Sequence, residues 1–144
     1  KDDKVSTKFD VRDKVAIEIE YEVLRDGHQL ISQFYFVNEL GHIIFSSRDN
    51  LDSPWKDSIS PRGIYKSVCR IPPDFLNESV VSVSFEIDTI DISNLWNITH
   101  VIKKDIVKFS VLDNMDSRGV RGNFPLGWHP DGVRPRLFWS VRKI

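Results

Sequence analysis

The region from Val15 to Leu24 alternates apolar and polar side chains. Glutamates stand at three of its even positions, Glu18, Glu20 and Glu22. Because consecutive side chains of a strand point to opposite sides, this pattern predicts a β-strand with one dry face and one hydrated face. The region from Val81 to Asp88 repeats the pattern. The same two-faced design is therefore expected along much of the chain.

Turn signals separate several further strand-like regions. We expect strands over residues 30–39, 41–45, 64–71, 105–114 and 133–141. Asp26-Gly27 predicts a hairpin turn, so the first three strands should form a meander. Pro72-Pro73 should end a strand, and residues 74–77 are expected to form a single helical turn. Residues 46–61 and 89–104 are predicted to be long polar connections.

These regions amount to about seven to nine strands and almost no helix. Antiparallel strands with one dry face generally stack as two sheets. The sequence therefore predicts an all-β fold, an antiparallel β-sandwich of the immunoglobulin-like or jelly-roll type. The 144 residues fit one domain over 1–144, with no position where a second core could begin.

Charge and cysteine content exclude several classes of function. Lysine and arginine number 20 against 21 for aspartate and glutamate, so no overall field favours nucleic acid. Cys69 is the only cysteine, which rules out an intrachain disulfide and indicates a buried thiol. No stretch reaches the roughly 20 apolar residues needed to span a bilayer.

No pattern in the sequence favours a metal, a cofactor or a catalytic centre. The four histidines match no metal-ligand spacing: His28, His42, His100 and His129. Four aspartates could converge on calcium, although turn formation explains them better: Asp88, Asp91, Asp113 and Asp116. The glutamate row of the first strand offers no carboxyl group with a distinct environment, so it is interpreted as a hydrated face rather than a glycosidase pair.

The order of local motifs is more specific than the fold class. It includes Gly41-His42-Ile43-Ile44-Phe45, then Gly63-Ile64-Tyr65, then residues 71–77 with the sequence IPPDFLN, and near the end Gly132-Val133-Arg134-Pro135 followed by Trp139. This succession, over nearly the whole chain, resembles the C-terminal domain of Wzt-type ATP-binding subunits of ABC transporters that export O-antigen and related polysaccharides.

The resemblance implies a β-sandwich that binds polysaccharide without catalysis, in the cytoplasm at the inner membrane, during lipopolysaccharide biosynthesis. It also implies a homodimer in which the C-terminal strand can be exchanged between the two copies, and association with the membrane subunit of the transporter. Residues 1–8 would be a linker from a nucleotide-binding domain, since no phosphate-binding loop occurs in this sequence.

A sugar-binding surface needs an exposed aromatic ring beside groups that donate and accept hydrogen bonds. Tyr35 and Gln33 meet this requirement if Phe34 and Phe36 point inward. The other candidates lie in polar segments: Trp55, Trp96, Trp128 and His129. Each could instead pack against the core or a partner. Trp139 alternates with apolar neighbours and is predicted to belong to the core.

Arginines make the C-terminal region locally basic: Arg118, Arg121, Arg134, Arg136 and Arg142. They could bind anionic sugar substituents, although a solvated or interface role is the simpler interpretation. The alternative function is an immunoglobulin-like module that binds a protein partner along a sheet edge.

Overall fold

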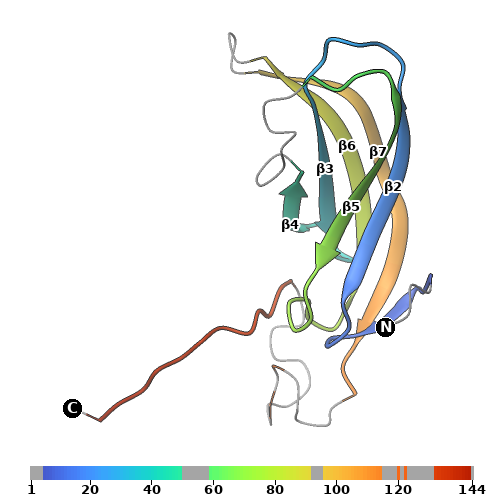
Figure 1. The fold of residues 1–144 in the computed structure, drawn as a ribbon. Coiled ribbons are helices and arrows are strands. Elements are labelled where there is room, and N and C mark those ends of the chain that lie inside the picture. Colours follow the sequence, from blue (N-terminus) through green and yellow to red (C-terminus); the bar gives the residue numbers. More distant parts are fainter. Residues whose placement is uncertain are drawn as a thin grey trace.

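A computed structural model describes residues 5–49, 59–91, 96–114, 120, 122 and 132–143 of this chain. Seven strands form two facing sheets, and the described residues contain no helix (Figure 1). The strands are β1 (Lys8–Asp10), β2 (Val15–Val23), β3 (Leu30–Val37), β4 (Ile43–Arg48), β5 (Gly63–Ile71), β6 (Ser79–Asp91) and β7 (Trp96–Leu112). The predicted all-β sandwich is confirmed.

The larger sheet has five strands in the order β1-β7-β6-β3-β4, and the smaller sheet pairs β2 with β5. All neighbours are antiparallel except β1, which runs parallel to β7. Phe9 of β1 meets Phe109 of β7 edge to face, with ring centroids 5.6 Å apart. The short first strand thus closes one edge of the larger sheet.

The core lies between the two sheets. Phe34 and Phe36 of β3 are buried together with Val83 and Phe85 of β6, and the rings of Phe34 and Phe85 lie 5.1 Å apart. Val15 and Ile17 of β2 cover them from the smaller sheet and belong to the same apolar cluster. The inward orientation predicted for Phe34 and Phe36 is therefore correct.

The expected meander of the first three strands is wrong. β2 pairs with β5, whereas β3 pairs with β4 and β6, so the chain crosses from one sheet to the other between β2 and β3. Gly27 has a positive φ of 97°, as a turn signal predicts, but His28 pairs with Ser60 rather than continuing a hairpin. A turn motif shows where the chain bends and leaves open which strands become neighbours.

The predicted polar connection over residues 89–104 is also wrong. β6 continues to Asp91 and β7 begins at Trp96, so these residues extend a long antiparallel ladder. Polar and β-branched residues are tolerated there because one edge of the ladder is exposed to water. Asp88 and Asp113 consequently lie near opposite ends of the β6–β7 pair and do not converge.

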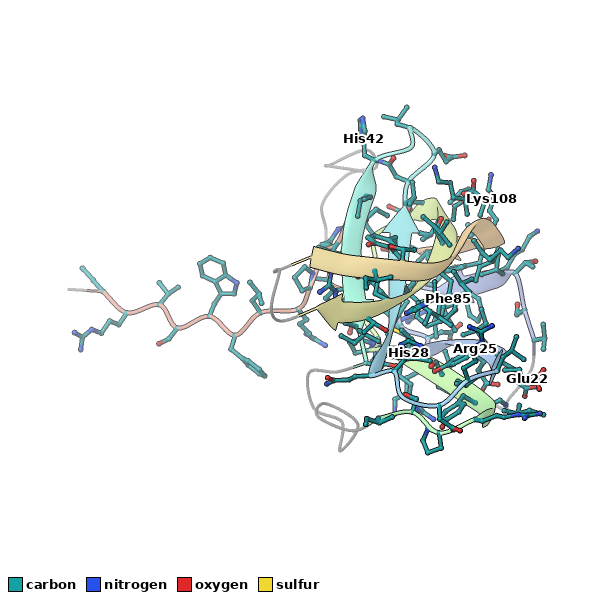
Figure 2. The ribbon with its side chains drawn as sticks, turned by 90° about the horizontal axis from the view of Figure 1, so that it is seen from above. Glu22, Arg25, His28, His42, Phe85 and Lys108 are labelled. Atoms are coloured by element: carbon teal, nitrogen blue, oxygen red, sulfur yellow. The ribbon has the colours of Figure 1, made fainter. Side chains whose placement is uncertain are left out.

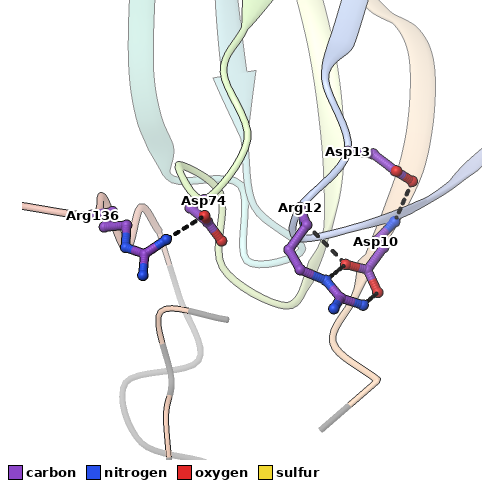
Figure 3. A network of polar contacts seen from close by, with 5 residues as sticks. All are labelled: Asp10, Arg12, Asp13, Asp74 and Arg136. Carbon is purple, nitrogen blue, oxygen red and sulfur yellow. Dashed lines mark hydrogen bonds and ion pairs between the residues drawn. The ribbon is translucent and has the colours of Figure 1, made fainter. Parts of the chain in front are cut away.

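Two short polar networks hold the ends of the strands (Figure 3). Between β1 and β2, the guanidinium of Arg12 donates to both carboxylate oxygens of Asp10, at 2.7 and 3.1 Å. The backbone N–H of Asp10 donates to Asp13 at 2.9 Å, which closes the turn. Asp74 follows the two prolines with a φ of 56° and forms a turn instead of the predicted helical turn.

The predicted last strand, residues 133–141, is not formed within this chain. Val133 makes an isolated bridge with Leu76, and the Arg136 guanidinium lies 3.7 Å from the Asp74 carboxylate. Beyond residue 136 the segment extends away from the sandwich (Figures 1 and 2). Trp139 is 85% exposed, so its assignment to the core is wrong for the single chain.

Candidate functional site

Small side chains along β6 create a groove on the outer face of the five-stranded sheet. Ser82 and Ser84 point away from the core, because they alternate with Val83 and Phe85, which are buried. Larger side chains flank this row: on β3, Tyr35 is opposite Ser84, and on β7, Lys108 is opposite Ser82. A row of serines between larger residues leaves a trough, which we call the outer groove.

The outer groove has a volume of about 630 Å³. Tyr35, Val37 and Ile43 line one side of it, Ile102 and Lys108 line the other, and Glu86 continues the serine row. This volume falls within the range of sites that hold small ligands. Figure 2 shows Lys108 on this side of the molecule, with Phe85 between the two sheets.

A bulge in β7 forms part of the groove wall. The pairing between β6 and β7 shifts between Val83 and Phe85, and Asp105 adopts a φ of 51°. Its backbone N–H donates to Ser84 Oγ at 3.1 Å, which fixes the bulge over the serine row. Bulges of this kind redirect side chains beside functional sites, and here Lys104 and Asp105 line the groove.

Tyr35 and Glu86 form a fixed polar pair at one end of the groove. Burial, together with its hydrogen bond to Glu86 and the charge of that carboxylate, raises the pKa of Tyr35 to about 12. Thr99 Oγ1 donates to Glu86 Oε1 at 2.9 Å. Glu86 therefore has two donors that hold its carboxylate in one orientation.

Glu86 and Asp88 have opposite pKa shifts. Burial by itself would raise the pKa of Glu86, but hydrogen bonds with Tyr35 and Thr99 outweigh it and keep that pKa below its usual value. Burial and the neighbouring Glu86 charge raise the pKa of Asp88. Glu86 is therefore the group of this pair that remains a carboxylate, able to accept hydrogen bonds from a ligand.

Gln33 shares the outer face with Tyr35 but is covered. Only 4% of its surface is exposed, and its Oε1 accepts a hydrogen bond from Arg48 Nε at 2.7 Å. The Arg48 charge lies close enough to lower the pKa values of both Tyr35 and Glu86 in part. Gln33 thus accepts its hydrogen bond from Arg48, and Arg48 lies beside the Tyr35–Glu86 pair.

The remaining predicted site residues fall mostly outside the described part of the chain. Trp55, Trp128 and His129 lie outside the described residues. Trp96 begins β7 and pairs with Asp91, at the end of the ladder, and its side chain is not described. Of the predicted set, the structure therefore brings together Gln33 and Tyr35.

Sequence reasoning missed the groove residues contributed by β6 and β7. Glu86 appeared in the two-faced pattern of β6, but nothing in that pattern placed it next to Tyr35. The register does so, because Gln33 pairs with Glu86 and Tyr35 with Ser84. Ile102 and Lys104 were assigned to a connection, so they could not be assigned to a sheet face at all.

A second, smaller cavity of about 190 Å³ lies between the two sheets. Ser32 Oγ lies 3.0 Å from Ser67 Oγ and 3.3 Å from the Tyr21 hydroxyl. Asp49 is exposed as a residue, but its carboxylate accepts the N–H of Ser32 at 3.0 Å, and the burial of that group raises its pKa. Cys69 lines the same cavity, and burial raises the pKa of its thiol.

No three His, Cys, Asp or Glu side chains within the described ranges are grouped so as to hold a metal ion. In the same part of the chain, no helix has the length and hydropathy required to cross a bilayer.

Comparison with known proteins gives a structural match but no sequence match. No protein-family model matches the chain, and no curated protein matches it. The crystal structure of the C-terminal domain of Wzt is similar, with a TM-score of 0.67 over 93% of this chain and 74% of that one. The two sequences are 15% identical. The chain therefore shares the β-sandwich fold of that domain.

Proposed function

We propose that this chain recognises a bacterial cell-surface polysaccharide of the O-antigen type without catalysing a reaction. The observation that carries the proposal is the outer groove, in which a partly exposed tyrosine stands beside a carboxylate already oriented by two donors. The fold shared with the C-terminal domain of Wzt supports it.

The outer groove offers both kinds of contact that a pyranose needs. The Tyr35 ring can stack on the weakly apolar face of a sugar, and the Glu86 carboxylate can accept hydrogen bonds from hydroxyl groups. Because Tyr35 and Thr99 hold Glu86 in place before the ligand arrives, little orientational freedom is lost on binding. A sugar without the matching hydroxyl would leave this partly buried acceptor without its ligand donor and would bind more weakly.

The roles of the other predicted residues remain proposals. Gln33 would act by positioning Arg48 beside Glu86. The other predicted residues, whose side chains the structure does not describe, would extend the binding surface: Trp55, Trp96, Trp128 and His129.

The C-terminal segment supports the proposed homodimer. Leu137, Phe138, Trp139 and Val141 are all largely exposed, although the sequence pattern is that of a strand. Within the described residues β5 pairs only with β2, so its other edge can accept a strand. We infer that residues 137–143 of one copy pair with the sandwich of a second copy, which would bury these apolar side chains.

The wider setting follows the Wzt resemblance. The domain would serve a polysaccharide-export ABC transporter at the cytoplasmic side of the inner membrane, with its membrane subunit as a partner and no nucleic acid or cofactor. Lys8, which the sequence places in the expected linker over residues 1–8, belongs to β1.

Titration of the protein with purified O-polysaccharides, followed by NMR of backbone amides, tests the proposed function. We expect saturable shifts around Tyr35, Ser84 and Glu86. The variants Tyr35→Ala and Glu86→Gln should weaken binding about tenfold or more, because each removes a contact made in the groove. Glu20→Gln, on the other sheet, is the matched control and should bind normally.

Two outcomes would contradict the proposed glycan recognition in the outer groove. Absence of saturable binding by both monomer and dimer over a broad panel of bacterial polysaccharides would favour a protein-interaction module. Retained binding in Tyr35→Ala would move the glycan site away from the outer groove.

A further inference from the structure

Aliphatic side chains stand on both sides of the outer groove. Ile102 on β7 is 54% exposed and lies across β6 from Tyr35. Ile43 on β4 is 61% exposed and pairs with Val37 at the other end of the groove. Single exposed isoleucines are common on protein surfaces, but these two line the groove itself and therefore offer apolar contact to a ligand that lies in it.

The register gives the position of Ile102 relative to the polar pair. Ile102 pairs with Glu86, and Tyr35 pairs with the adjacent outward residue, Ser84. Since β3, β6 and β7 are neighbours, Tyr35 and Ile102 are two strand spacings apart across the sheet and two residues apart along it, roughly 12 Å between backbones. A single pyranose ring fits between them, with one face on the tyrosine and its other side toward the isoleucine.

Ile102 and Glu86 are cross-strand neighbours that offer different chemistry to such a ring. The Glu86 carboxylate accepts a hydrogen bond from a hydroxyl group, whereas the side chain of Ile102 can neither donate nor accept one. A hydroxymethyl group pressed against Ile102 would lose hydrogen bonds to water unless its hydroxyl turned toward Glu86 or Lys104. A methyl group at the same place would lose none and would bury apolar area.

We infer that the outer groove selects 6-deoxyhexoses, sugars that carry a methyl group at C6 in place of the hydroxymethyl group. The inference rests on the proposed glycan-binding function and adds the class of sugar that the groove takes. The second aliphatic pair, Val37 and Ile43, lies further along the groove and supplies the same contact for another residue of the glycan chain.

Matched pairs of methyl glycosides test the inference. L-rhamnose is compared with L-mannose, L-fucose with L-galactose and D-fucose with D-galactose, since each pair differs only in the C6 hydroxyl group. Affinities are measured from NMR shifts of groove amides. We expect at least one 6-deoxy sugar to bind about fourfold or more tightly than its parent hexose, the affinity gained by burying one methyl group.

The variant Ile102→Ser places a hydroxyl where the methyl group would be received. In this variant the affinity ratio between a 6-deoxy sugar and its parent hexose should fall to about one, while the NMR shifts around Glu86 persist. Ile64→Ser is the matched control, because Ile64 is 81% exposed on β5 of the other sheet and the change leaves the groove intact. The control should keep the full preference.

The possible failures are distinguishable. Equal binding of both members of every pair, with shifts in the groove, would overturn the 6-deoxy inference and leave glycan recognition standing. A preference that survives in Ile102→Ser would also overturn it. Absence of groove shifts with every monosaccharide and with the polysaccharide panel would overturn the inference together with the proposed function.

Discussion

The two outer faces of the sandwich differ although the same alternation produces both. On the two-stranded sheet, Glu18 and Glu20 are exposed beside Lys66, at 2.8 and 3.7 Å from its ammonium group. On the five-stranded sheet, Gln33 and Ser82 are polar and yet buried. Figure 2 shows Glu22 on the outer side of the smaller sheet and Lys108 on that of the larger one.

The difference lies in the side chains that surround each polar position. On the smaller sheet, the outward row pairs long charged side chains from both strands, and these are exposed to water. A row of serines between a tyrosine and an isoleucine makes a hollow with a covered polar floor. A polar outer row therefore indicates a binding surface only where the neighbouring strands provide larger side chains.

The largest expected effect tests the inward orientation on which this comparison depends. Phe85 is 1% exposed and lies next to the outward Glu86 in β6. Phe85→Ala should lower the free energy of unfolding by about 3–5 kcal/mol, because it leaves a cavity between the sheets. Urea denaturation measures the change. A loss close to that of a surface substitution would mean that the two faces of β6 are exchanged.

A smaller effect should distinguish the covered outer face from the hydrated one. Gln33→Ala should cost about 1–2 kcal/mol, since it removes a buried hydrogen bond to Arg48 and its packing. Glu22→Ala, on the exposed row of β2, should change stability by no more than about 0.5 kcal/mol. Equal effects of the two substitutions in chemical denaturation would abolish the contrast.

Alkaline titration addresses the groove tyrosine directly. The pKa of Tyr35 is about 12 in the folded protein, above its ordinary value of 10.0. The unfolded chain therefore loses this phenolic proton first, and stability should decline as the pH rises from about 10 toward 12. Tyr35→Phe should remove the last step of the ultraviolet titration and reduce that decline. A last step that persists in the variant would contradict the assignment.

The smallest effect is expected on the charged face. The hydrogen bond and charge of Lys66 lower the pKa of Glu18, but about half of each side chain is exposed, so water screens the pair. Glu18→Gln should shift the melting temperature within experimental error, and any shift should vanish in high salt. A shift that resists salt would show that this face is covered in solution by a partner.

The sequence predicted most of what depends on local alternation. It placed the strands around Val15, Leu30, Ile64 and Val81, and it oriented Phe34 and Phe36 correctly. It failed where neighbours in space decide the outcome. The alternation of side chains along a strand identifies its two faces. The pairing of β2 with β5, in contrast, depends on packing between segments far apart in the chain.

The candidate site shows the same division. Tyr35 could be proposed from its own strand, because the alternation of β3 places it opposite the buried phenylalanines. Glu86 and Ile102 could not be proposed, since their positions beside it arise from the register of β6 with two other strands. Trp139 was misassigned because a two-faced pattern does not state whether the surface that covers it belongs to the same chain.

The bulge at Asp105 lets β7 contain extra residues without changing how its inward side chains pack in the core. Its extra residues project over the groove, while Phe109 and Val111 remain buried. Insertions or deletions there would alter the height and charge of one groove wall without shifting a single core contact. One scaffold could in this way accommodate chemically different ligands through changes in a few residues.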